Sequence, residues 1–153
     1  MKRFIAALSL LGAASAAPAV EIHVNNPWVR SATQGQAATP AYVDIASDTE
    51  LKLVGATSPW ARKVEFRAIE VKDGIPMERA VAAIDVPVGT VRLAPRGEHL
   101  VLIDATRAFG NGDFVPITLN FEDARRTTHT VDLRAQARGL LLPTSAARAS
   151  ESK

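Results

Sequence analysis

The sequence has 153 residues and a formal net charge of +2, with 47% hydrophobic residues and no cysteine. This length suits a single domain with an apolar core, and the lack of cysteine excludes disulfide bonds, thiolate metal sites and cysteine nucleophiles. Setting aside Lys2 and Arg3 lowers the 18 basic residues to 16, which balance the 16 acidic ones, so the composition argues against nucleic acid as a partner.

Residues 1–19 have the pattern of a bacterial signal peptide. Two basic residues come first, residues 4–14 are apolar but too few to span a bilayer, and two A-x-A cleavage motifs follow at 14–16 and 17–19. Because no cysteine lies near these motifs, lipid attachment at a processed N-terminal cysteine is not expected. We therefore expect cleavage of the signal peptide, a periplasmic protein, and no membrane span in the mature chain.

Residues 20–137 predict one all-β domain. Short apolar or alternating runs are separated by turn-forming Gly, Pro, Asn and Asp residues, without convincing helical periodicity between them. This spacing favours an antiparallel sandwich or a Greek-key barrel. Residues 138–153 lose the pattern and predict a disordered tail. The runs expected to form strands are 20–24, 28–30, 41–47, 51–57, 63–71, 82–86, 90–94, 99–105, 114–122 and 129–135.

Alternation within two of these runs assigns side chains to faces. In residues 63–71, Val64 and Phe66 share one face, while Glu65 and Arg67 lie on the other. In residues 99–105 both faces are apolar, which predicts a strand in the interior of the sheet.

Enzyme motifs are missing from the sequence. It contains no G-x-S-x-G elbow, no H-E-x-x-H pair and no P-loop. The stretch GNGDF at 110–114 has two glycines but lacks the third glycine and the helix that a dinucleotide-binding loop needs. We therefore expect a protein without catalytic activity.

Met77 is one candidate functional residue, because it is the only methionine apart from the first residue. It follows the turn-forming pair Asp73-Gly74, where a polar side chain is usual. Its side chain either fills an irregular gap in the core or serves as a soft thioether ligand for Cu(I).

His99 is the second candidate. It opens an apolar run directly after a Pro-Arg-Gly-Glu turn, and 21 residues separate it from Met77. It is either a half-exposed residue that caps a strand or an imidazole metal ligand. The short strand pair and two turns between the two residues allow both to reach the same end of a sandwich.

Four other residues are expected to have structural roles. His23 and His129 are expected to be structural or solvated, and Trp28 and Trp60 are expected to pack against the core.

Several ordered stretches resemble the periplasmic copper chaperone family PCu(A)C. They are WVR, AYVDI, DGIPM, VPVGTVRLAPRGEHLVL and GDFVPITLNFE, and the resemblance covers residues 20 to 135. It implies a cupredoxin-like Greek-key β-barrel that binds Cu(I) through exposed His and Met side chains. It also implies a copper-accepting partner in the periplasm or anchored in the membrane, in the assembly of the binuclear copper centre of cytochrome oxidase.

The family's ligand motif is a His, ten residues, a Met, twenty-one residues, then His-x-Met. At this spacing Met77 falls on the first Met and His99 on the second His, while Phe66 and Val101 stand at the other two positions. The resemblance thus implies Met77 and His99 as the copper ligands. The leading hypothesis is transient Cu(I) binding and delivery; the alternative is a paralogue without metal that acts as an interaction module on the same barrel.

Overall fold

The computed structural model describes residues 19–139, which form ten β-strands and no helix. Apart from residues 19, 138 and 139, the predicted signal peptide and the predicted tail lie outside the described residues. The strands are β1 (Ile22–Arg30), β2 (Ala38–Ser47), β3 (Leu51–Thr57), β4 (Ala61–Lys72), β5 (Ile75–Val81), β6 (Ile84–Val86), β7 (Gly89–Leu93), β8 (His99–Ala105), β9 (Phe114–Asp123) and β10 (Thr128–Arg138).

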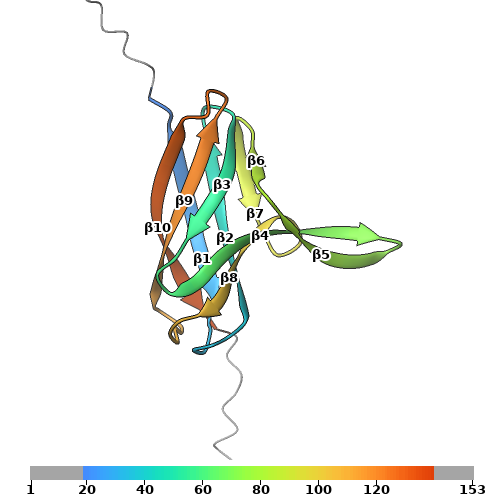
Figure 1. Cartoon of the computed structure of the whole chain (residues 1–153), viewed down its shortest axis with the longest axis vertical. Helices are drawn as coiled ribbons and strands as arrows, with labels where there is room; N and C mark the ends of the chain where they lie inside the picture. Colours follow the sequence, from blue (N-terminus) through green and yellow to red (C-terminus); the bar gives the residue numbers. More distant parts are fainter. Residues whose placement is uncertain (1–18, 140–153) are drawn as a thin grey trace, which may run out of the picture.

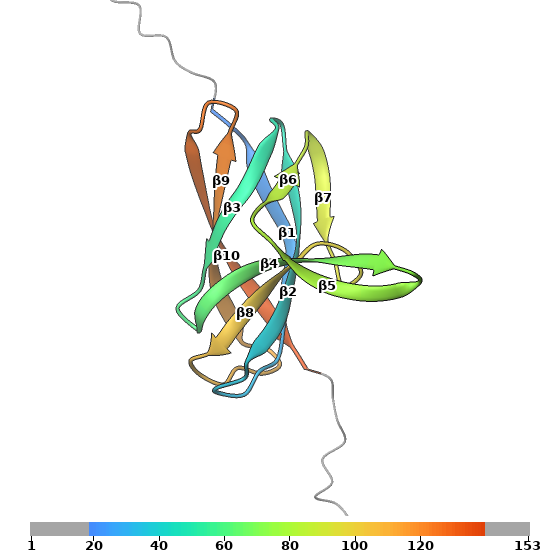
Figure 2. The same cartoon turned by 45° about the vertical axis from the view of Figure 1, so that its right-hand side comes forward.

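Hydrogen bonds join nine strands in one path, in the order β5-β4-β8-β2-β1-β10-β9-β3-β6, and β7 pairs with β2. The pair β1–β10 is parallel, and the other pairs of described strands are antiparallel. The path curls round so that the strands enclose a common interior (Figures 1 and 2). The predicted all-β class is confirmed. Within the described residues, no helix is long and apolar enough to cross a membrane.

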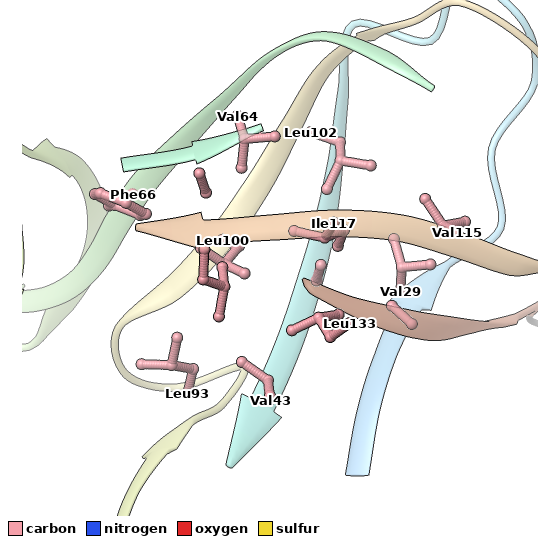
Figure 3. Close-up of a cluster of buried hydrophobic side chains, with 14 of the residues drawn as sticks. Val29, Val43, Val64, Phe66, Leu93, Leu100, Leu102, Val115, Ile117 and Leu133 are labelled. Carbon is pink, nitrogen blue, oxygen red and sulfur yellow. The ribbon is translucent and has the colours of Figure 1, made fainter. Parts of the chain in front are cut away.

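The core lies between the inward faces of these strands. Leu100 and Leu102 of β8, Ile117 of β9 and Val29 of β1 are almost completely buried there (Figure 3). Strand β8 pairs with β2 on one side and β4 on the other, which confirms its predicted interior position. The alternation predicted for residues 63–71 is also present, since Val64 and Phe66 are both buried in the core.

Strand β5 was not predicted. Nearly every residue of Ile75–Val81 is exposed, so the strand has no buried face that would give the sequence an alternating pattern. Its hairpin with β4 is closed by the two-residue turn Asp73-Gly74, whose φ angles of 52° and 79° are those of a type I′ turn. The Asp-Gly pair is typical of this turn because glycine adopts positive φ without steric cost.

The long strand β4 carries β5 away from the body of the molecule. Its first half pairs with β8, and residues 66–72 pair with β5. Residues 66–81, which we call the arm, project to one side in both views (Figures 1 and 2). His99 lies where the arm meets the body, since it pairs in register with Arg67.

Candidate functional site

His99 is a buried residue whose two ring nitrogens both have partners. Only 2% of its surface is exposed. Its Nδ1 lies 3.0 Å from the carbonyl oxygen of Gly97, and its Nε2 lies 2.9 Å from Oε1 of Glu78. The prediction that His99 opens a strand is confirmed, but the side chain is enclosed rather than half-exposed.

Glu78 also binds an arginine. Nη1 of Arg67 donates to Oε2 of Glu78 at 2.7 Å, while Nη2 donates to Glu65 at 3.2 Å. Lys63 extends the row of charges by donating to Glu65 at 2.9 Å. Arg67, Glu78 and His99 come from β4, β5 and β8, and they join the arm to the body; we call them the Arg67–Glu78–His99 cluster.

The electrostatics of the cluster keep Glu78 ionised. The hydrogen bond from Arg67 lowers the pKa of Glu78 below its ordinary value, with a smaller lowering from His99, and partial burial opposes both. An ionised carboxylate can only accept hydrogen bonds, as can the carbonyl of Gly97. Both ring nitrogens of His99 are therefore engaged by oxygen atoms of Gly97 and Glu78, so neither is open to a metal ion in this structure.

Met77 lies on the other face of the arm. It precedes Glu78, and successive side chains of a strand point to opposite faces. Met77 pairs with Glu70, and 54% of the surface of Met77 is exposed. Glu70 forms an ion pair with Arg79 at 2.9 Å. The structure thus brings His99 together with Glu78 and not with Met77. Copper binding by Met77 and His99 stays a prediction.

The two positions expected to have lost their ligands lie in different surroundings. Val101 shares a face with His99, two residues along β8, and is buried. Phe66 lies in the core (Figure 3). It pairs with Leu100, the neighbour of His99 on β8, so it is on the face of the sheet opposite His99. The placement of Phe66 at a ligand position is therefore wrong in this fold, because a side chain at 66 points away from His99.

Arg67 and Glu78 were not predicted as site residues, although two features of the sequence pointed to them. Alternation had already placed Arg67 on the face opposite Phe66, and ten residues separate Arg67 from Glu78, as the motif requires. Without strand β5, however, nothing in the sequence showed that Glu78 would lie across from Arg67 and His99.

The remaining histidines have local roles. His23 is exposed and lies 3.9 Å from Glu21. Nε2 of His129 lies 3.1 Å from Asp123, at the turn between β9 and β10. The backbone N–H of Thr127 lowers the pKa of this carboxyl, and His129 adds to the lowering. Among residues 19–139, no group of three or more His, Cys, Asp and Glu side chains is placed to hold a metal ion.

Trp60 packs on Phe109, with ring centroids 5.9 Å apart, and the Arg107 guanidinium lies 4.3 Å from its ring. These contacts agree with the packing role expected for Trp60.

Comparison with protein families gives one match that covers most of the chain. The model of the family described as "Putative lipoprotein LpqE-like" matches residues 10–133. A relative from Leifsonia xyli subsp. xyli (strain CTCB07), named "Putative lipoprotein Lxx21020", is 28% identical over 115 residues, which cover 74% of this chain and 69% of the relative.

Solved structures with a similar fold are PCuAC domains. The copper-bound PCuAC domain from PmoF2 is 26% identical, with a TM-score of 0.57 and coverage of 78% of this chain and 97% of that one. The Cu(I) form of DR1885 from Deinococcus radiodurans is also 26% identical, with a TM-score of 0.55 and coverage of 82% and 81%. The apo PCuAC domain from PmoF1, at 22% identity and a TM-score of 0.57, covers 76% and 93% and supports the fold alone. The predicted cupredoxin-like fold is confirmed.

Proposed function

Because the chain belongs to the LpqE-like family, a family of PCuAC type, we propose that it is an exported interaction module on a copper-chaperone barrel and holds no Cu(I) at rest. The observation that carries this proposal is the 2.9 Å contact between Glu78 and His99, supported by the ion pair of Glu78 with Arg67. No catalytic role is proposed.

The donor set of the cluster does not suit Cu(I). This ion prefers thioether, thiolate and imidazole ligands. Glu78 offers a hard carboxylate, and Arg67 offers a permanent positive charge without a lone pair. To reach Nε2 of His99, copper would have to displace Glu78 and then lie beside the guanidinium cation of Arg67. Both effects cost free energy, and binding of copper to a single imidazole does not offset that cost.

The exposed apolar side chains of the arm favour a protein as the binding partner. Val71, Ile75 and Met77 are exposed apolar side chains on this projecting hairpin. Val71 lies on one face of the hairpin and Ile75 and Met77 on the other, so both faces of the arm offer apolar contacts to a protein. The cluster holds the base of the arm against β8, so these residues are presented in a fixed orientation. The partner we propose is a periplasmic or membrane-anchored protein.

Transient Cu(I) binding and delivery is the second candidate. It is favoured by the exposed thioether of Met77, which is open to an incoming ion, and by the copper-bound PCuAC domain among the similar structures. In this case Glu78 moves away from His99 and β5 turns so that Met77, which lies on the other face of the arm, reaches His99. The ion then passes to an acceptor such as the cytochrome oxidase copper centre.

A Cu(I) titration against a chromophoric chelator separates the two candidates. We expect the purified protein to leave the chelator–copper complex intact, because both nitrogens of His99 are engaged. Met77→Ala and His99→Ala should then match the unmodified protein. If the unmodified protein instead removes copper from the chelator and each variant loses about tenfold or more in affinity, the interaction-module proposal is wrong and copper delivery is favoured.

A further inference from the structure

An aromatic and basic surface covers the outer side of the sheet next to the cluster. Trp28 of β1 pairs in register with Tyr42 of β2, and their ring centroids are 4.5 Å apart. Arg30 follows two residues after Trp28 on the same face and pairs with Arg138 of β10. The guanidinium of Arg138 lies 5.4 Å from the Trp28 ring. We call this surface the Trp28–Tyr42 face.

A cavity of about 270 Å³ opens on the Trp28–Tyr42 face. Trp28, Tyr42, Leu93 and Pro95 give it an apolar lining, and Arg138 stands at its rim. Planar, rigid walls of this kind suit an aromatic or proline side chain, since both stack on aromatic rings with little loss of conformational freedom. Burial raises the pKa of Tyr42, so its hydroxyl stays neutral and remains available as a donor or acceptor.

The charge of the face is positive. Its one carboxylate at the cavity, Asp44, already accepts hydrogen bonds from Arg92 at 3.0 Å and from Asn26 at 3.3 Å. Arg30 and Arg138 are both exposed, and neither forms an ion pair with another of the described residues. Because guanidinium groups bind carboxylates in a bidentate geometry, these two are well suited to acidic side chains.

We propose that the Trp28–Tyr42 face binds an acidic segment of a partner protein, with an aromatic or proline side chain in the cavity and carboxylates paired with Arg30 and Arg138. The inference rests on the proposed function and names the chemistry of its partner. A recessed cavity with apolar walls favours a side chain over the flat array of headgroups on a membrane. The arm lies beyond His99, whose ring is 5.9 Å from Tyr42, so one partner can contact both surfaces.

The test uses a capped peptide with the sequence Trp-Pro at its centre and two acidic residues on each side of it. We expect it to shift the NMR signals of the Trp28 indole N–H and the Arg138 backbone amide, with an affinity that falls as salt is added. The double variant Arg30→Gln/Arg138→Gln should bind about tenfold more weakly or worse. Arg62→Gln, which removes an exposed arginine of β4 from another part of the surface, is the matched control and should bind normally.

Three results with peptides would overturn the inference: no shift at millimolar peptide, equal binding of a peptide with lysines in place of the acids, or unchanged affinity in the double variant. Preferential binding of phosphatidylglycerol vesicles at the same residues would assign a lipid surface and also overturn it. Should the double variant not fold, Arg138→Gln alone provides the comparison. Copper uptake by the unmodified protein, with peptide binding intact, would contradict the proposed function and leave this inference standing.

Discussion

A chain that carries Arg67→His, Glu78→Met and Val101→Met is expected to bind Cu(I) at least about a thousandfold more tightly than the unmodified protein. These three positions share a face with His99: Arg67 pairs with it, Glu78 contacts it, and Val101 lies two residues along the same strand. The substitutions remove the guanidinium cation and the carboxylate. They leave two imidazoles and two thioethers converging from three strands, which is a donor set that suits Cu(I).

The matched control is Phe66→His/Val101→Met, which supplies the same donor types at the positions chosen by spacing. We expect no comparable gain, because a side chain at 66 points into the core and Arg67 and Glu78 still occupy the site. Competition against a chromophoric Cu(I) chelator measures both variants, with circular dichroism to verify the fold. A folded triple variant that ignores copper, or a control that gains as much, would refute this assignment of the four positions.

Phe66→Ala is expected to lower the free energy of unfolding by about 3–5 kcal/mol, the range for deleting a buried phenylalanine side chain. Phe66 is 6% exposed and belongs to the main core cluster, so its loss leaves a cavity beneath the arm. Met77→Ala is the control and should change the unfolding free energy by no more than about 0.5 kcal/mol, because Met77 is largely exposed.

Urea denaturation followed by tryptophan fluorescence measures both unfolding free energies. A small effect of Phe66→Ala together with a large one of Met77→Ala would mean that the faces of β4 and β5 are the reverse of those described. The two substitutions therefore test which side of the arm belongs to the core.

The barrel could be predicted from the sequence because most of its strands have one buried face. Residues 51–57 and 99–105 were predicted with the observed bounds, since turn residues flank them and their apolar side chains follow a clear pattern. The segments 20–24 and 28–30 proved to be one strand, β1, with an irregular register between Asn25 and Trp28 that interrupts the alternation. Among the strands of residues 19–139, only the exposed strand β5 was missed altogether.

Of the contact between His99 and Glu78, only His99 could be predicted from the sequence, because β5 has no buried face. His99 stands out because an imidazole opens an apolar strand, but its partner Glu78 lies on the strand that has no buried face. The motif's spacing also has a one-residue ambiguity: ten residues separate Phe66 from Met77 and Arg67 from Glu78 alike. Register resolves the ambiguity, because only Arg67 and Glu78 share the face of His99.

Spacing along the sequence and pairing across the strands select different residues. Twenty residues separate Glu78 from His99, one fewer than the motif has, whereas Met77 preserves the full count. The intervening chain contains β6, β7 and the turns around Pro87 and Gly89, and loops of this kind tolerate changes of length that leave the faces of the strands unchanged. Counting along the sequence does not show which side chains share a face, whereas cross-strand pairing does.

The central claim is that Glu78, and not copper, is the partner of His99 Nε2. NMR correlation of the imidazole nitrogens with the ring carbon-bound protons, before and after one equivalent of Cu(I), tests it most directly. We predict that the shifts of both ring nitrogens of His99 stay unchanged when copper is added, while Glu78→Ala changes the Nε2 signal. A copper-dependent shift of Nε2 to the value of a metal-bound nitrogen in the unmodified protein would contradict the claim.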